Sequence, residues 1–261
     1  MKRFALLGYG AIAEEMLRCL EEAGELDALA GVLVRRAHPA EARFALVRSI
    51  DALLDLGADM VVECAGHDAM RQYGPVVLAH GTDLLCASVG VLADPGFEAL
   101  LGEPAARLWI PSGAVAGIDG LLAARSAGLR RVTYTSVKPP PAWKGTPGES
   151  RIGPGRTVFF EGSARQAALQ FPQNANVGAT VALAGLGLDR TTVRLVSDPD
   201  ARGPLGIIEA QGDFGSLRFE ILAYASARNP KTSLLTAHSL LLALREGFCF
   251  DFFASVRRVS A

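Results

Sequence analysis

Paired cysteines are missing from this chain of 261 residues. The four cysteines are scattered along the sequence and form no CxxC motif. This pattern is typical of small buried side chains in a reducing compartment, so we expect a cytoplasmic protein without a disulfide framework. Histidines are also few, four in all, and both residue types are too dispersed to indicate a metal cluster, so no metal site is expected.

Long apolar runs and an excess of one charge are missing as well. The apolar stretches fall well short of the ~20 residues that span a bilayer. The apolar run near the start breaks at Gly8, too early for a signal peptide. Lysine and arginine number 26 against 27 aspartate and glutamate, a net charge of −1 with no long run of one sign. Nucleic acid and membranes are therefore not expected as partners, and a small-molecule substrate is.

Apolar strand-like segments alternate with helix-length segments in the first part of the chain, which indicates a parallel, doubly wound sheet. After Gly120 several strand-like segments follow one another without helices between them, which indicates an open antiparallel or mixed sheet. The sequence therefore predicts an α/β fold, with a Rossmann doubly wound parallel sheet and a second α+β domain. The predicted boundaries are 1–118 and 230–261 for the Rossmann domain and 119–229 for the second domain.

A glycine-rich turn follows the first strand-like segment and opens the first helical one. Residues 8–13 read Gly-Tyr-Gly-Ala-Ile-Ala, a GxGxxA variant of the dinucleotide-binding fingerprint. Gly8 allows the tight turn, and Gly10 lets the backbone approach the pyrophosphate. The helix start, at Ala11 and Ile12, offers amide donors to the phosphates. We expect NAD or NADP at this turn; a tight turn without a cofactor is the alternative.

The end of the second strand-like segment bears on the choice between these cofactors. An NAD site usually has a carboxylate there to bind the ribose hydroxyls. This chain has Arg35 and Arg36, with His38 just beyond, and guanidinium groups suit a 2′-phosphate. NADP is therefore slightly favoured over NAD; tolerance of both and a pair of solvated arginines remain open.

Several further segments together resemble the L-aspartate dehydrogenase family. They are residues 61–67, 110–121, 135–147, 159–191, 198–199, 212–215 and 229–239. The resemblance implies an NAD(P)-dependent oxidative deamination of a small, aspartate-like amino acid, or the reduction of its imine or oxo-acid. It also implies a Rossmann domain completed by the C-terminal helix, and a second domain that carries substrate groups and a homodimer interface.

Small and amide side chains near two predicted helix starts are candidates for contact with the cofactor. Ala114 lies in a small-residue segment after a strand, where the backbone can approach the nicotinamide; a packing seam is the alternative. Asn174 and Asn176 follow Pro172 at a helix start, and both are candidates to cap that helix. By resemblance, Asn176 also contacts the cofactor.

Candidate proton carriers are few. Lys138 ends a strand just before three prolines and is a candidate to pair with a substrate carboxylate or to move protons; a solvated lysine is the alternative. Ala65 and Gly66 lie at the carboxyl end of a strand, the usual edge of a ligand site in such sheets, and are candidates for contact with the cofactor. His67 follows them and is a candidate proton carrier, but a simple loop histidine fits equally. His238 lies on an apolar helix and is expected to be partly buried.

The family pattern has an Asn-x-His sequence before a Gly-x-Phe-Gly turn, and its histidine serves in the chemistry. Counting back from residues 212–215 puts Pro204 at the asparagine position and Gly206 at the histidine position. Three interpretations stay open. Another residue supplies the proton path, the enzyme acts on a different substrate, or the protein is a sensor or inactive relative that binds a dinucleotide without turnover.

Overall fold

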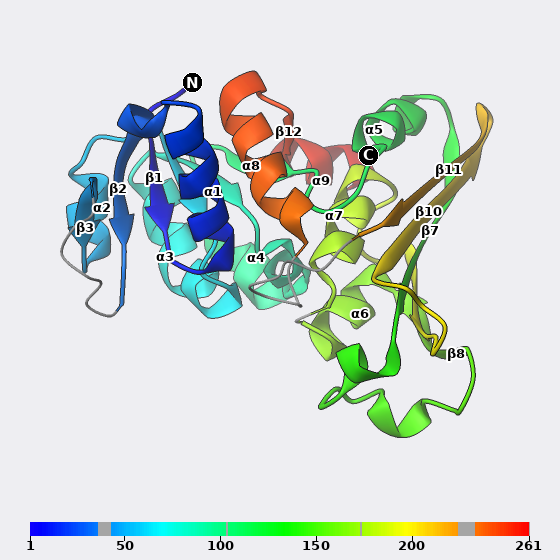
Figure 1. The fold of residues 1–261 in the computed structure, drawn as a ribbon. Coiled ribbons are helices and arrows are strands. Elements are labelled where there is room, and N and C mark those ends of the chain that lie inside the picture. Colours follow the sequence, from blue (N-terminus) through cyan, green and yellow to red (C-terminus); the bar gives the residue numbers. More distant parts are fainter. Residues whose placement is uncertain (36–42, 103, 173, 224–232, 261) are drawn as a thin grey trace.

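Two β-sheets lie side by side with helices between and around them (Figure 1). The structure is a computed structural model, and it describes residues 1–35, 43–102, 104–172, 174–223 and 233–260. No helix within these residues is long and apolar enough to cross a membrane. The predicted α/β fold class is confirmed.

The first sheet has seven strands, six of them parallel, with β12 antiparallel at one edge. In spatial order the strands are β12 (Cys249–Asp251), β6 (Leu108–Pro111), β5 (Asp83–Cys86), β4 (Met60–Glu63), β1 (Phe4–Leu7), β2 (Leu29–Leu33) and β3 (Ala45–Val47). The associated helices and 3₁₀ turns are α1 (Ala11–Glu22), η1 (Leu26–Ala28), α2 (Ile50–Leu54), α3 (His67–Ala79), η2 (Val89–Ala93), α4 (Pro95–Leu101), α8 (Leu234–Glu246) and α9 (Phe252–Ser260).

Helices cover both faces of this sheet because its central strands are apolar on both sides. Every residue of β1, β2 and β4 is buried. Phe4 and Leu6 pack with the apolar sides of α1 and α8, whereas Ala5 and Leu7 face the cluster that includes residues of α3. Such double burial is the usual condition of a parallel sheet. Helix α8 packs with α1 on the same face of the first sheet.

The second sheet is mixed, because β7 and β9 run parallel while the other neighbouring strands are antiparallel. Its spatial order is β11 (Gly215–Leu222), β10 (Leu205–Gly212), β7 (Leu129–Lys138), β9 (Thr192–Ser197) and β8 (Thr157–Ser163). The connecting elements are α5 (Ile118–Ser126), η3 (Pro140–Trp143), η4 (Glu149–Arg151), α6 (Ala164–Gln170) and α7 (Asn176–Ala184).

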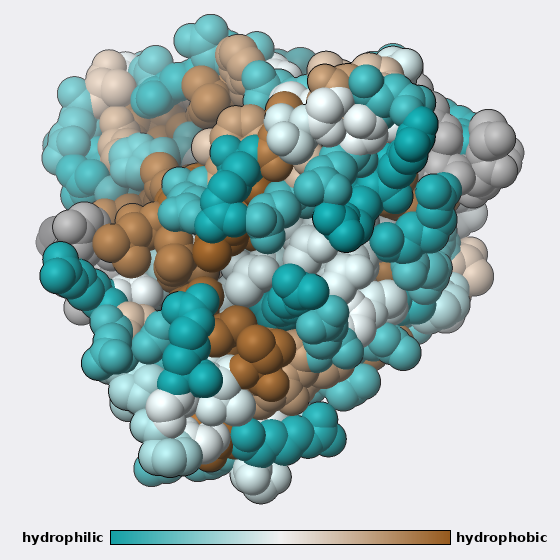
Figure 2. All heavy atoms as spheres, turned by 90° about the vertical axis from the view of Figure 1, so that its right-hand side faces the viewer, coloured by the Kyte–Doolittle hydropathy of each residue, from teal (hydrophilic) through white to brown (hydrophobic). Residues whose placement is uncertain are grey.

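The two faces of the second sheet differ in character. The inner face packs against α5, α6 and α7, and its hydrophobic core is continuous with that of the first sheet. The outer face is mostly hydrophilic (Figure 2), with ion pairs such as Arg194 with Glu161. Because one core spans both sheets, the boundaries 1–118, 119–229 and 230–261 stay a prediction.

Candidate active site

The candidate cofactor residues gather at one edge of the first sheet. Its strands β6, β5, β4, β1 and β2 run parallel, so the loops after them emerge at the same edge, which is where open α/β sheets bind ligands. The predicted cofactor residues in or beside these loops are Gly8, Gly10, Ala11, Ile12, Arg35, Ala65, Gly66 and Ala114. Their roles stay predictions. Arg36 and His38 lie outside the described residues, so only Arg35, which is exposed, can be placed.

The glycine loop has the geometry that a dinucleotide requires. Gly8 has φ +106°, and a Cβ built there would lie 2.6 Å from the Cβ of Ala65, so this position accepts only glycine. At Gly10, by contrast, a built Cβ meets no described atom within 4 Å. The first loop is therefore packed tightly against the β4–α3 loop while it leaves open space beside Gly10.

The start of α1 has no side-chain cap among the described residues. Gly10 is its N-cap and has no side chain to accept from the first-turn amides. Serine or aspartate side chains cap α2, α4, α6 and α8 instead. The first amides of a helix have no partner within the helix, and together with the helix dipole they attract phosphate. The residues present thus fit the pyrophosphate of NAD(P).

Asn176 joins this edge to the second part of the chain. It is the first residue of α7, and its Oδ1 accepts the backbone N–H of Gly90 at 2.9 Å. The Nε2 atom of His67, the first residue of α3, lies 2.9 Å from the same oxygen. Because Oδ1 only accepts, Nε2 of His67 carries the hydrogen of this bond. The two donors fix how the Asn176 carboxamide is turned.

Lys138 reaches the same helix start from the second sheet. Its Nζ donates to Oδ1 of Asn174 at 2.9 Å and lies 5.2 Å from the centre of the Trp143 ring. Burial lowers the pKa of Lys138 to about 8. Among the described residues Lys138 forms no ion pair, and no described carboxylate offsets the loss of water. A lysine of this kind can both accept and donate a proton near neutral pH.

Comparisons with known proteins agree with this arrangement. A family model described as the NAD-binding domain of homoserine dehydrogenase matches residues 8–107, and one described as the C-terminal region of aspartate dehydrogenase matches residues 119–247. An L-aspartate dehydrogenase of Ralstonia nicotianae is 43% identical over 259 residues, which covers 94% of this chain and 97% of that one. The chain belongs to the L-aspartate dehydrogenase family.

Further relatives extend the match. An L-aspartate dehydrogenase of Pseudomonas aeruginosa is 42% identical over 260 residues, covering 94% of this chain and 97% of the other. The crystal structure of an aspartate dehydrogenase from Thermotoga maritima has a TM-score of 0.73 at 25% identity and covers 94% of this chain and 96% of that one. The predicted family is confirmed, and so is the predicted class of protein, an oxidoreductase with an NAD(P)-binding domain.

Position 206, where the family pattern predicts a histidine, is in the interior layer of the second sheet. Gly206 of β10 pairs with Ser136 of β7. A Cβ built at Gly206 would lie 3.3 Å from Oη of Tyr134, which is itself buried beside α7. Because alternate residues of a strand share a face, Tyr134, Ser136 and Lys138 lie on the same side of β7. A side chain at 206 would therefore point into the layer that holds Lys138.

Two expectations about asparagine and histidine side chains were wrong. Neither Asn174 nor Asn176 caps α7, because Ala175 is the N-cap and no side-chain bond is made there. Their carboxamide oxygens are instead used by Lys138 and by the Gly90 and His67 pair. Asparagine is so common at helix starts that its longer-range contacts could not be foreseen from the sequence.

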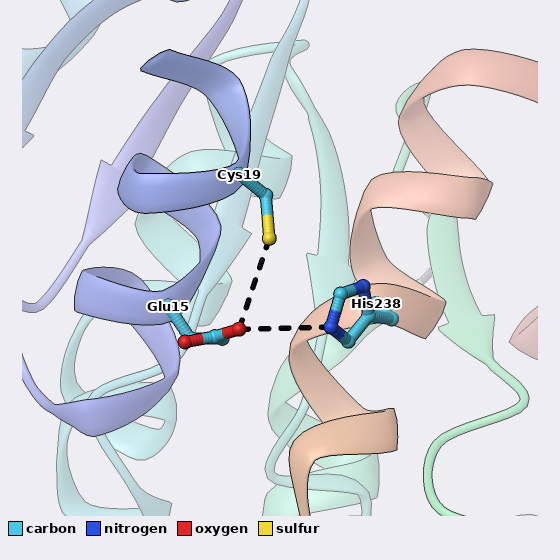
Figure 3. A group of neighbouring side chains, drawn as sticks. All are labelled: Glu15, Cys19 and His238. Carbon is cyan, nitrogen blue, oxygen red and sulfur yellow. Dashed lines mark hydrogen bonds and ion pairs between the residues drawn. The ribbon is translucent and has the colours of Figure 1, made fainter. Parts of the chain in front are cut away.

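His238 is the other correction. Its side chain is exposed, whereas partial burial was expected, and it lies on the side of α8 that faces α1. There Nε2 lies 3.6 Å from a carboxylate oxygen of Glu15, and Cys19 is on the next turn of α1 (Figure 3). Arg18 donates to that same oxygen at 2.6 Å, so the carboxylate is already paired. Glu15, Cys19 and His238 thus form a contact between α1 and α8.

The sequence analysis missed Glu63, the last residue of β4. Its side chain is fully buried, and its carboxylate accepts the N–H groups of Ala65 and Gly66, both at 2.8 Å. It also accepts the N–H and the Oγ hydroxyl of Ser88, both at 3.0 Å. Burial raises the pKa of Glu63, and these donors oppose that shift. The available signal was a single charged residue at the end of an apolar strand.

Proposed function

We propose that the chain is an NAD(P)-dependent L-aspartate dehydrogenase in which Lys138 is the proton carrier. The reaction converts L-aspartate, water and the oxidised cofactor to oxaloacetate, ammonium and the reduced cofactor, with release of one proton. The names of two relatives that are 43% and 42% identical support the substrate. The observation that carries the chemistry is the Lys138 ammonium, held beside the start of α7 with its pKa lowered to about 8.

Bound NAD(P) would supply the acceptor for the hydride of the substrate Cα. The free α1 start and the space beside Gly10 would hold its pyrophosphate. Asn176 would bind near the nicotinamide end of the cofactor. Gly90 and His67 already occupy its Oδ1, so the carboxamide nitrogen is left as the donor. In this arrangement His67 orients Asn176 and is not itself the proton carrier.

Loss of the hydride leaves an imine on the substrate, which water must attack before ammonia departs. Water loses a proton on attack and the amine gains one on departure, so one group that can do both serves each stage. Lys138 has this capacity because its pKa is about 8. One of its N–H groups is used by Asn174, which leaves two hydrogens, or a lone pair and a hydrogen, for substrate and water.

The test is oxidation of NADPH and of NADH with oxaloacetate and ammonium, in the wild type and in Lys138→Met. We expect turnover by the wild type and loss of turnover in the variant, with NADPH binding unchanged. Turnover that survives in Lys138→Met would mean that Lys138 is not the proton carrier. Absence of turnover in a wild type that still binds NADPH would exclude the aspartate assignment.

One observation favours a second candidate, a relative that binds the dinucleotide without turnover. Gly206 offers no acid or base, and burial raises the pKa of its neighbour Tyr134 to about 12, too high for easy proton exchange. The same assay separates the two candidates. The Lys138 geometry makes the enzyme the better supported of the two.

Three finer properties complete the proposal. NADP is the favoured cofactor because Arg35 stands where a carboxylate would select NAD. A homodimer is proposed, as the family resemblance implies, with the outer face of the second sheet (Figure 2) as its candidate interface. Placement in the cytoplasm is supported by four unpaired cysteines. Light scattering of the purified protein would test the dimer.

A further inference from the structure

Glu63 is the buried group that links the loops of the candidate site. It ends β4, and its Oε1 accepts from the amides of Ala65 and Gly66, in the turn that leads into α3. Its Oε2 accepts the amide of Ser88, in the turn after β5, and the Ser88 hydroxyl donates to Oε1. One carboxylate thus fixes the separation of two neighbouring loops that share no strand.

Both loops continue directly into contacts of the candidate site. Ala65 packs against Gly8 of the glycine loop so closely that no Cβ fits there. Ser88 precedes η2, where the amide of Gly90 donates to Asn176. On the other loop, His67 follows Gly66 and contacts the same Asn176 oxygen. The two loops that Glu63 binds therefore contact the glycine loop and Asn176.

We propose that Glu63 is a positioning residue that holds the β4–α3 and β5–η2 loops at the spacing at which Gly90 and His67 together orient Asn176 toward the cofactor. This rests on the proposed dinucleotide site, and it does not depend on which substrate is used.

A carboxylate suits this position better than any neutral side chain. Its partners are three backbone N–H groups, the Ser88 hydroxyl and the Cys86 thiol, whose Sγ lies 3.8 Å from Oε2, and an ionised carboxylate can accept from all of them. Hydrogen bonds to a charged group are roughly twice as strong as those between neutral groups, which offsets part of the cost of burying Glu63. A side chain needed only to fill space at the end of an apolar strand would be apolar, since an unpaired buried charge is very unfavourable.

Glu63→Gln tests the proposal with a minimal change of shape. A glutamine oxygen at the Oε1 position keeps three donors satisfied, so the amide NH₂ is expected at the Oε2 position, facing the Ser88 N–H without an acceptor. The variant therefore loosens the β5–η2 loop and leaves the β4–α3 loop tied. We expect its Kd for NADPH to rise about tenfold, the size of losing one hydrogen bond to a charged group. Amide exchange should accelerate over residues 86–92.

A double-variant cycle distinguishes positioning from a general loss of stability. The Kd for NADPH is measured for Glu63→Gln, for Asn176→Ala and for the double variant. If Glu63 acts through Asn176, the double variant binds no more weakly than Asn176→Ala alone. Independent effects would multiply, and that result, or a Kd for Glu63→Gln within twofold of the wild type, would overturn the proposal.

Two further variants guard against a folding artefact. Leu54→Ala removes a buried side chain of α2, which packs in the same hydrophobic cluster as α3. This variant should lower the melting temperature while leaving NADPH binding unchanged. Gly90→Ala reaches Asn176 from the other side without altering any buried charge, because its Cβ would lie 2.8 Å from the Asn176 oxygen. It should weaken NADPH binding to a similar extent, and unchanged binding would contradict the proposal even if Glu63→Gln does not fold.

These measurements need no substrate, so they stand apart from the assay of the proposed function. A wild type that binds NADPH but does not convert oxaloacetate would refute the aspartate activity and leave the cycle fully interpretable. Conversely, effects on Kd that multiply in the double variant would refute the role of Glu63, even if the enzyme still turns over.

Discussion

The two sheets contribute to the site by different means. The first sheet presents mainly backbone: the turn at Gly8, the open space at Gly10 and the uncapped amides of α1. The second sheet presents side chains on one face of β7, chiefly Lys138, beside the bare position of Gly206. A site built from backbone depends on the fold and binds any dinucleotide of the right shape. A site built from side chains can change its chemistry through one substitution without disturbing the fold.

The strongest test of this division is Lys138→Met, which removes the ammonium and keeps the length of the side chain. We expect kcat to fall about 10²–10⁴-fold, the usual cost of losing a general acid or base. NADPH should bind as before, because the first sheet is untouched. Lys144→Met is the matched control, since Lys144 lies six residues away and is exposed. An equal loss in both variants would contradict a special role for Lys138.

Gly10→Ala and Gly8→Ala test the contribution of the backbone of the first sheet. A Cβ at Gly10 meets no described atom, so the variant should fold normally and bind NADPH at least about tenfold more weakly, because the methyl group occupies space meant for the pyrophosphate. At Gly8 a Cβ collides with Ala65 and φ is +106°, so stability should fall by about 1–3 kcal/mol or more. Thermal unfolding and NADPH titration separate the two effects. Equal stability loss in both would refute the distinction.

The sequence predicted the backbone features of the first sheet better than the side-chain contacts of the site. The glycine loop and the parallel sheet could be predicted, because glycine spacing and apolar runs report local backbone geometry. Lys138 was found as a candidate, but its lowered pKa depends on its burial in the folded chain. The contacts of Asn176 and the role of Glu63 could not be foreseen, since they join loops that meet only in the folded chain. Helix capping, a local rule, predicted the wrong partners for Asn174 and Asn176.

The pH dependence of the reaction tests the role of Lys138 in the second sheet. Oxidation of aspartate needs Lys138 without its proton, so kcat/KM should rise with pH and level off above about 8. Below that pH the ammonium form accumulates and the rate falls. The rise should be absent in Lys138→Met. A profile that is flat between pH 7 and 9 in the wild type would contradict this assignment.

Gly206→His should add a second group that titrates near the ordinary histidine pKa of ~6.5 and so extend activity to lower pH. The gain is expected to be modest, roughly tenfold or less at pH 6.5, since Lys138 already serves at higher pH. The Cβ at 206 would lie 3.3 Å from Oη of Tyr134, so that ring must shift slightly. Gly206→Ala measures the cost of the shift alone. A histidine variant that behaves like the alanine variant would mean that position 206 does not reach the substrate.

The smallest effect is expected at Arg35, a predicted cofactor contact that depends on a side chain. Arg35 is exposed, so its attraction for a 2′-phosphate is screened by water and salt. Arg35→Glu should therefore weaken NADPH binding only several-fold and improve NADH binding by a similar factor, as a carboxylate can accept from the ribose hydroxyls. The ratio of the two Kd values should narrow as the ionic strength rises in the wild type. A ratio insensitive to both salt and substitution would mean that cofactor choice is made elsewhere. Cofactor binding by the described residues of the first sheet would then rest on backbone groups without help from Arg35.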